Sequence, residues 1–462
     1  MRVRSIAALT LGGLFAPMAL GFSPNDPLFP SQWGLVTTRA TEAWDVMPTA
    51  PRDTVVAIID GGVDLEHPDL RDRLWTASQA VTGPPACGAA AVAGVGSHGY
   101  DLVDCDDRPN PEPMSDGSRP EPGYSHGTKM AGIVGASVGN GAGIAGVNPW
   151  ARIMPIRVCG SAPTSCSQLK EIEAIAWAGA AGARVVNMSL GGPGTSAVGQ
   201  SRLRAAFDTF PNTLYVISAG NDGLDLDDPA GANNAFPCEI PAENVICVAN
   251  LSRTDTLAPS SNFGAVSVDI AAPGASIATT TPTDAVVPNY ATGSGTSEAA
   301  PHVAGVASLL MSAFPNASAA EVKQAILSSA RPLAALTGQV ASAGALDARA
   351  ALDALRARRP PPATIPTPIR PPTVGTLVRR PLGHGRVRVT FPLSTAGALT
   401  TWRILRIAGG ATRQLASGRR VQPGNVGATL RGRPGDLFTI VLTATNAAGR
   451  LTTKRAAVRI KQ

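Results

Sequence analysis

Short apolar runs alternate with helical patterns along residues 55–328 of this 462-residue chain. The runs are rich in Val, Ile and Ala and nearly continuous, which is typical of strands buried on both faces. They predict strands over Val55–Ile59, Arg152–Val158, Val185–Ser189, Leu214–Ser218, Val245–Val248 and Val268–Ala271. Helical spacing predicts helices over His126–Val138, Gln168–Ala181, Ser201–Phe210, Ser297–Ala313 and Ala319–Ser328. Because the two kinds of element alternate, we expect an α/β fold with a mostly parallel central sheet that helices flank on both faces.

The two ends of the chain depart from this pattern. Residues 1–21 contain two arginines, followed by an apolar run that ends in small residues. This order is typical of a secretory signal peptide. The alternative is an uncleaved N-terminal anchor. Residues 357–372 are rich in proline and predict an extended linker that is not helical.

A small all-β domain is predicted over residues 373–462 (a β-sandwich). Short segments of alternating polarity are separated there by turn signals. The predicted strands are Arg386–Phe391, Thr400–Ile407, Leu437–Ala444 and Ala456–Ile460. The segment Ala444–Gly449 also resembles the last hairpin of fibronectin type III modules.

Three polar residues stand at the ends of apolar elements and together suggest nucleophilic catalysis. Ser297 follows a glycine-rich loop and begins a helix rich in alanine. Asp60 ends an apolar strand and precedes two glycines, and His126 stands where a loop becomes a helix. An alcohol needs a base to become a nucleophile, and the base needs a group that orients it. For Ser297 alone, a helix-capping role would be the simpler interpretation.

The motifs around these residues identify a family resemblance. D-G-G-V-D from Asp60, H-G-T from His126 and G-T-S-E-A-A-P around Ser297 resemble the three active-site motifs of the subtilisin-like serine peptidases. The resemblance covers residues 30–355 and implies a catalytic domain over residues 22–356. It implies a secreted endopeptidase that forms an acyl-enzyme intermediate. The alternative is a catalytically inactive relative that binds peptides or acts as a surface adhesin.

The same resemblance implies residues that bind the substrate and its oxyanion. Asn221 follows a buried strand and a glycine and is similar to the family's oxyanion-hole asparagine, where losing one donor costs about 10²–10³ in turnover. An Asx-turn is the alternative role. Two further segments resemble those that pair with the substrate backbone; they consist of Ser189, Leu190, Gly191, Gly192, Ser218, Ala219 and Gly220.

A structural calcium ion is a second implication of the resemblance, and no catalytic cofactor is expected. Asp69 matches the family position that supplies a carboxylate ligand, and Asn140 lies in a loop similar to the one that supplies amide and carbonyl oxygens. For Asp69, an ordinary surface acid is an equally good interpretation.

Two local features bear on specificity and on the surroundings of the nucleophile. The acidic and proline-rich run Asp104–Pro111 resembles the kexin-like branch, which cleaves after basic pairs, but a solvated loop is the favoured interpretation. Lys129 stands where the family usually has a histidine, and Glu298 stands where it usually has methionine or another uncharged residue. We expect them to form an ion pair behind the site, because a lone buried carboxylate would be costly there.

Composition restricts the kinds of binding partner and the cellular compartment that we expect for this protein. The net charge of +6 comes from basic residues after Leu355, but aromatic residues are only 4%, which argues against nucleic-acid binding. Six cysteines suit an exported protein, and their spacing favours Cys87–Cys105, Cys159–Cys166 and Cys238–Cys247 among fifteen connectivities. We expect an extracellular monomer that acts on polypeptides and has no stable membrane insertion after removal of the signal peptide.

Overall fold

The chain divides into two compact units between Arg359 and Pro360, and each unit is described by itself. The computed structural model describes residues 23–88, 91–114, 116–119, 123–160, 166–194, 196–228, 234–359, 373–394, 400–408, 411–420, 424–433, 435–446 and 451–460. The predicted signal peptide and most of the predicted linker lie outside these residues. The last helix of the first unit, α8 (Ala348–Arg358), extends two residues into the predicted linker. Arginine is a good helix former, so the proline at 360 and not the arginines limits this helix.

A nine-stranded sheet organises the first unit, in the order β12-β13-β9-β8-β7-β6-β1-β5-β4. All neighbours pair in parallel except β12 and β13. The strands are β1 (Thr54–Asp60), β4 (Tyr100–Asp101), β5 (Ala151–Arg157), β6 (Val185–Met188), β7 (Leu214–Ser218), β8 (Val245–Leu251), β9 (Ile270–Pro273), β12 (Arg331–Pro332) and β13 (Gly344–Ala345). All six predicted strands are present, and the predicted α/β fold class is confirmed.

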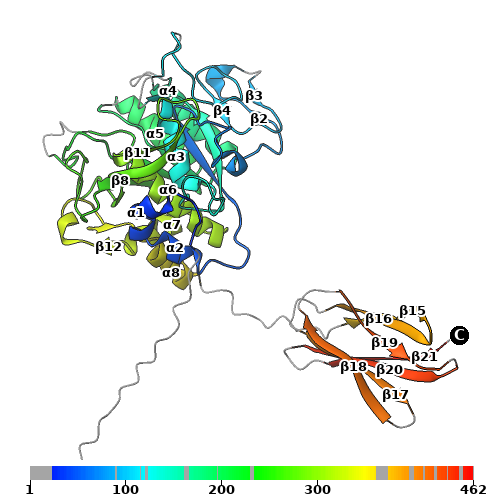
Figure 1. Cartoon of the computed structure of the whole chain (residues 1–462). Coiled ribbons are helices and arrows are strands. Elements are labelled where there is room, and N and C mark those ends of the chain that lie inside the picture. Colours follow the sequence, from blue (N-terminus) through cyan, green and yellow to red (C-terminus); the bar gives the residue numbers. More distant parts are fainter. Residues whose placement is uncertain are drawn as a thin grey trace, which may run out of the picture. The chain divides into compact units, whose positions relative to one another are not determined.

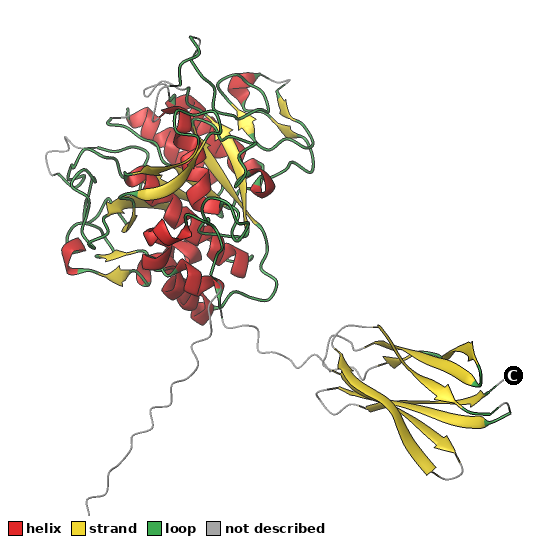
Figure 2. Cartoon of the chain, viewed as in Figure 1, coloured by secondary structure: helices red, strands yellow, loops and turns green. Residues whose placement is uncertain are grey.

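Alternate residues of the central strand face two separate cores. In β1, Val56 and Ile58 belong to one buried cluster, whereas Ala57 and Ile59 belong to the other. Helices cover both faces (Figures 1 and 2), as the near-continuous apolar strands require. They are α1 (Trp33–Thr37), α2 (Ala40–Trp44), α3 (Gly123–Gly135), α4 (Gln168–Ala180), α5 (Ala197–Thr209), α6 (Thr296–Ala313), α7 (Ala319–Ser328) and α8. The smaller strands are β2 (Val81–Thr82), β3 (Val92–Ala93), β10 (Ile277–Thr281) and β11 (Asn289–Gly293).

Helix α6 is buried along nearly its whole length and packs against six strands of the sheet. Pro301 lies inside this helix, which continues through the proline. Proline has no N–H for the carbonyl four residues earlier, which belongs to Ser297. The hydroxyl of Ser189 donates to that carbonyl oxygen at 2.8 Å. The contact replaces the missing helical bond and fixes the start of α6 to the end of β6.

The second unit is an antiparallel β-structure with its own core. One sheet has the order β14-β16-β15 with β19 also on β16, and the other has the order β18-β17-β20-β21. Their inward residues, such as Val389, Phe391, Ile440 and Leu442, form one cluster. The strands are β14 (Thr373–Val374), β15 (Val378–Gly383), β16 (Arg386–Ser394), β17 (Thr400–Ala408), β18 (Ala411–Arg420), β19 (Gly424–Arg431), β20 (Leu437–Asn446) and β21 (Leu451–Arg459). Residues 447–449, half of the segment that resembles a fibronectin hairpin, lie outside the described residues.

Three local disulfides stabilise the first unit. Cys87 is bonded to Cys105, Cys159 to Cys166 and Cys238 to Cys247, so the predicted pairing is confirmed. The second of these bonds begins directly after β5 and ends just before α4. It therefore constrains the connection that leads into the first turn of α4.

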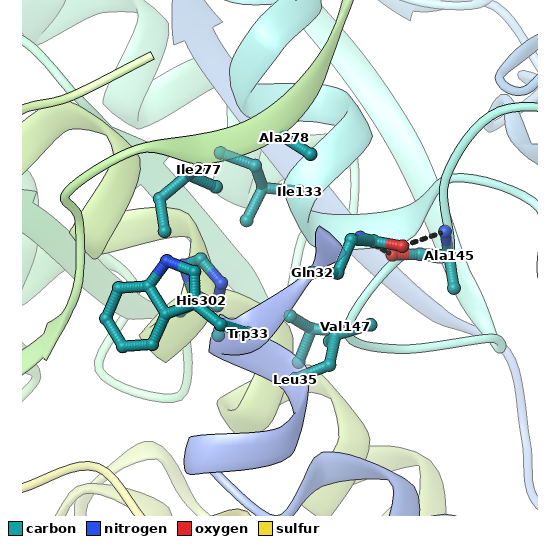
Figure 3. Close-up of a pocket in the computed structure, with 10 residues that line it drawn as sticks. Gln32, Trp33, Leu35, Ile133, Ala145, Val147, Ile277, Ala278 and His302 are labelled. Carbon is teal, nitrogen blue, oxygen red and sulfur yellow. Dashed lines mark hydrogen bonds between the residues drawn. The ribbon is translucent and has the colours of Figure 1, made fainter. Parts of the chain in front are cut away.

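Helix α6 contains a buried histidine. His302 is 3% exposed and borders a small cavity of about 10 Å³, among Trp33, Ile277 and Val147 (Figure 3). Its Nδ1 atom donates to the carbonyl oxygen of Glu298 at 2.9 Å. Burial lowers the pKa of His302 to about 4, so this imidazole is neutral at physiological pH.

This low pKa predicts a loss of stability in acid. The unfolded chain binds a proton on His302 below its ordinary pKa of 6.5, whereas the folded chain binds one only near pH 4. The stabilisation is complete above pH 6.5 and is lost as the pH falls towards 4, by about 3 kcal/mol. A catalytically inactive protein that keeps His302 is compared with the same protein carrying His302→Gln, and both are unfolded with denaturant at a series of pH values. The free energy of unfolding should therefore fall more steeply towards acid in the protein that keeps His302. Parallel stability profiles from pH 7.5 to pH 4 would contradict this assignment.

Candidate active site

An aspartate and a histidine meet at the carboxyl end of β1. Asp60 is the last residue of this strand, and His126 is the fourth residue of α3. The Nδ1 atom of His126 lies 2.9 and 2.8 Å from the two carboxylate oxygens of Asp60. The carboxyl ends of strands in an open α/β sheet are where such folds bind ligands. The residues that the sequence selected as orienting acid and base are therefore in direct contact.

The turn after β1 holds the Asp60 carboxylate in place. The side chain is buried, and the backbone N–H of Gly61 donates to its Oδ1 atom at 2.7 Å. Helix α3 can approach this turn closely because residue 127 is glycine, and a Cβ atom there would lie 2.2 Å from the carbonyl oxygen of Gly62. Replacement of Gly127 by any larger residue would push His126 away from Asp60.

Opposing effects set the charge state of the histidine. Burial lowers the pKa of His126, but the charge and hydrogen bond of Asp60, together with the charge of Glu298, outweigh it. The net shift of the His126 pKa is upward from 6.5. An imidazolium that forms when this residue accepts a proton is therefore stabilised by two carboxylates.

The serine occupies the second position of α6 and faces the same cleft. Its Oγ atom lies 3.3 Å from the carbonyl oxygen of Ser189 and can donate to it. Among the described residues, no hydrogen bond joins this hydroxyl to His126. Hydrogen bonds of this kind are often long in the absence of a substrate. The structure therefore brings Ser297 to the site without aligning its hydroxyl on the imidazole.

The predicted oxyanion donor is oriented by a residue that the sequence did not single out. The Oδ1 atom of Asn221 accepts hydrogen bonds from the backbone N–H and the hydroxyl of Thr296, at 2.8 and 3.1 Å. With its oxygen held in this way, the side-chain nitrogen of Asn221 is available to the cleft beside Ser297. The Thr296 hydroxyl in turn accepts from the N–H of Gly220 at 3.1 Å.

A cleft of about 620 Å³ collects most of the predicted site residues, namely Asp60, His126, Ser189, Leu190, Gly191, Gly192, Asn221 and Ser297. This volume suits an extended segment of peptide. Ser218, Ala219 and Gly220 do not line it. Ala219 is fully buried and its N–H donates to Val248, so this segment supports Asn221 from behind. The sequence missed Glu171 of α4, which also lines the cleft.

The expected contact between Lys129 and Glu298 is not formed. Among the ion pairs of the described residues, none joins Lys129 to Glu298. Burial raises the pKa of Glu298, and the positive charges of His126 and Lys129 offset part of this effect from a longer distance. The carboxylate instead lies over Gly293, where a Cβ atom would be 2.1 Å from Oε1. Glycine at this position makes the space that Glu298 occupies.

The acidic run before the histidine motif lies away from the cleft. Its residue Asp104 forms an acidic group with Asp101 and Glu112 that could hold a metal ion. Arg157, however, lies among these acids, with its Nη1 atom 2.6 Å from both Asp101 and Asp104. None of the residues of Asp104–Pro111 lines the cleft. The first part of this run, Asp104–Asp106, is exposed as a solvated loop would be, whereas Pro109 and Pro111 are buried.

The two residues predicted to bind calcium are in contact. Asp69 is fully buried, and burial raises its pKa despite hydrogen bonds from Asn140 and from the N–H of Ile144. The side-chain nitrogen of Asn140 lies 2.7 Å from Asp69 Oδ1, and its oxygen accepts from Ala142. The asparagine thus presents its nitrogen to the carboxylate in this conformation.

A second carboxylate beside this loop, that of Asp26, was not identified from the sequence. Asp26 is 2% exposed and accepts the N–H of Gly139 with Oδ2, while its Oδ1 atom is buried without a hydrogen-bond partner. Asp26 and Asp69 accept hydrogen bonds from the neighbouring loop residues Gly139 and Asn140, so both carboxylates lie against the same loop. Two buried carboxylates, one with an unsatisfied oxygen, and a loop with several carbonyls suit the oxygen preference of Ca²⁺.

Comparisons with known proteins agree with this geometry. The model of the Subtilase family matches residues 51–354. Thermitase from Thermoactinomyces vulgaris is 36% identical over 302 residues, which cover 64% of this chain and 88% of thermitase. An extracellular protease from Xanthomonas campestris is 33% identical over 355 residues, but the chain spans only 57% of its length. A solved protease from Pseudoalteromonas arctica superposes with a TM-score of 0.56 at 30% identity, over 72% of this chain and all of that one.

The fold, the site and these comparisons thus define a serine-type endopeptidase with a subtilisin-like α/β fold. The chain belongs to the Subtilase family of serine-type endopeptidases.

Proposed function

We propose that this protein is an extracellular endopeptidase in which Ser297 is the nucleophile, His126 the general base and Asp60 the residue that orients the base. The observation that carries this assignment is the contact of His126 Nδ1 with both oxygens of Asp60, in the cleft that Ser297 also lines. Extracellular proteases among the relatives support secretion. In the described part of the chain, no helix has the length and apolarity needed to cross a bilayer.

The roles proposed for these groups imply the following reaction. His126 takes the proton of Ser297 through Nε2 while Oγ attacks the carbonyl carbon of the substrate. Asp60 stabilises the imidazolium, which then protonates the leaving amine. Water attacks the acyl-enzyme by the same sequence of proton transfers, and Ser297 is released.

Charge that develops on the substrate oxygen meets preorganised donors. The side-chain nitrogen of Asn221 and the backbone N–H of Ser297 supply two hydrogen bonds. The N-terminus of α6 adds a partial positive charge from its free N–H groups. Ser189–Gly192 supports the substrate backbone on one side of the cleft, and the glycines there allow a close approach of the two chains.

The inactive peptide-binding alternative has a direct test. Purified full-length protein is incubated with a peptide library, and the products are identified by mass spectrometry. We expect cleavage at internal bonds, which removal of Ser297 abolishes. A binding protein or an adhesin would retain the same peptides uncut, and that result would reject the proposed activity.

We also propose a structural calcium ion at Asp69, Asp26 and the loop that contains Asn140. The two buried carboxylates would hold the ion, and backbone carbonyls of the loop would complete its oxygen ligands. The ion would tie residue 26, near the start of the described chain, to the loop that follows α3. The proposal assigns it no role in the proton transfers.

Chelation tests the calcium site. Binding to the folded state alone should stabilise an inactive Ser297→Ala protein by about 3 kcal/mol when calcium exceeds its dissociation constant a hundredfold. Thermal unfolding is followed with EGTA and with increasing calcium, for this protein and for the same protein carrying Asp69→Asn. We expect the calcium-dependent rise in Tm to disappear with Asp69→Asn. An equal rise in both proteins would place the ion elsewhere.

A further inference from the structure

One side chain in the cleft has no part in the chemistry described above. Glu171 is the fourth residue of α4 and lines the cleft together with Gly160 and Gln168 at one end and with the Ser189–Gly192 segment. Its side chain is largely enclosed, since the residue is only 9% exposed. It is a carboxyl group at the wall of a binding cleft and not on the outer surface.

The carboxyl group of Glu171 has no partner of its own. Among the described residues, no hydrogen bond or ion pair reaches its side chain, while its backbone N–H donates to the carbonyl oxygen of Ser167 at the start of the helix. The other acid that lines the cleft, Asp60, is already paired with His126. The described lining of the cleft contains neither lysine nor arginine. Glu171 is therefore the one acid of this lining that nothing neutralises.

A buried carboxyl group without a partner costs folding free energy. Burial alone raises the pKa of Glu171 to about 7, with no compensating interaction. The group does not hold α4 to the rest of the molecule, because a neutral side chain of the same shape would fill the position at lower cost. Because the Glu171 carboxyl group lowers the stability of the free protein and faces the cleft, it points to a favourable contact with a ligand that occupies the cleft.

We propose that Glu171 forms a subsite for a cationic side chain, lysine or arginine, of the polypeptide substrate. This inference rests on the proposed function and names a substrate preference within it. A cation that enters this end of the cleft would supply the missing ion pair in a water-poor environment, where a charge-assisted hydrogen bond is strong. Glu171 would act as a specificity residue at a distance from the scissile bond, and it takes no part in proton transfer.

The preference can be measured with matched peptides. Each of the four positions before the scissile bond is occupied in turn by lysine, by the uncharged norleucine of similar length, or by glutamate. We expect wild-type enzyme to prefer lysine over norleucine in kcat/KM by roughly tenfold or more at one of these positions, since a hydrogen bond to a charged group has about this effect. The ratio should fall to about 1 in Glu171→Gln.

Two variants make the test specific. Glu243→Gln removes an exposed acid outside the cleft and should leave the lysine preference unchanged. Glu171→Lys should reverse the preference, so that glutamate is favoured at the same position. Glu171→Gln should also raise Tm at pH 8, whereas a merely structural role predicts a lower Tm with unchanged specificity.

The outcomes separate the subsite from the catalytic assignment. If no peptide is hydrolysed, the proposed function itself fails. If peptides are hydrolysed at rates that do not distinguish lysine from norleucine at any of the four positions, or if Glu171→Gln keeps the preference, the subsite is overturned and the peptidase assignment stands.

Discussion

Replacing Ser297 with alanine is expected to lower kcat for peptide hydrolysis by about 10⁶-fold, the size that the same change has in subtilisin, a member of this family. The hydroxyl is the only atom that the change removes, and it sits on the second residue of α6 in the cleft that His126 and Asn221 also line. No other described serine of the cleft can replace it, because the hydroxyl of Ser189 donates to the Ser297 carbonyl oxygen.

The rate of this variant is measured against the uncatalysed reaction with a fluorogenic peptide. A residual rate above water is expected, because Asn221 and the binding segments remain. The alanine variant should have an unchanged Tm and should still bind peptide. Loss of less than about tenfold in kcat would mean that another residue attacks the substrate.

The second large effect is expected from Asp60→Asn, which should lower kcat by about 10⁴-fold. The N–H of Gly61 donates to one carboxylate oxygen at 2.7 Å, so an asparagine must keep its oxygen there. Its amide nitrogen then faces Nδ1 of His126 and donates to it. The imidazole is forced to carry its own proton on Nε2, where it cannot accept one from Ser297.

If Asp60 sets the tautomer of His126, Asp60→Asn should change kcat without the changes in stability and substrate binding that a folding defect would cause. Asp60→Asn should keep its Tm close to that of the wild type and bind substrate with little change in KM. Asp72→Asn, which removes an exposed acid, is the matched control and should retain full activity. Equal losses in the two variants would reject an orienting role for Asp60.

The elements around the site were predictable because their signals are local. The strand that ends at Asp60 and the helix that begins at Ser297 are apolar runs bounded by glycine, and the structure places their ends within one residue of the predicted positions. The three disulfides also join cysteines that are near in sequence. The start of α7 has a capping box, in which Ser318 and Glu321 exchange hydrogen bonds, and this signal is likewise local in sequence.

Residues that act through tertiary contacts were not predictable in this way. Thr296 orients Asn221 across 75 positions of sequence, and Asp26 reaches Gly139 across 113. Glu171 looks like an ordinary polar residue on an amphipathic helix until the fold turns that position towards the cleft. Local sequence patterns do not indicate which polar side chains will share a cavity, because such residues are far apart in the chain.

In the second unit, some strands were not predicted from the sequence for a different reason. The strands β14, β15, β18 and β19 were missed, and each pairs with only one neighbour, whereas β21 also lies at an edge and was predicted in part. Edge strands contact solvent on one side and carry polar and charged residues, which weakens the apolar alternation on which prediction depends. The central strands β16, β17 and β20 keep that alternation and were found.

The central claim is that one serine, and no other, forms a covalent bond with the substrate. Wild-type protein is treated with a fluorophosphonate, and the modified peptide is located by mass spectrometry. We predict one adduct per chain, on Ser297, and much slower labelling of Asp60→Asn. An adduct on a different residue, or an enzyme that hydrolyses peptides at full rate after Ser297 is blocked, would contradict the account.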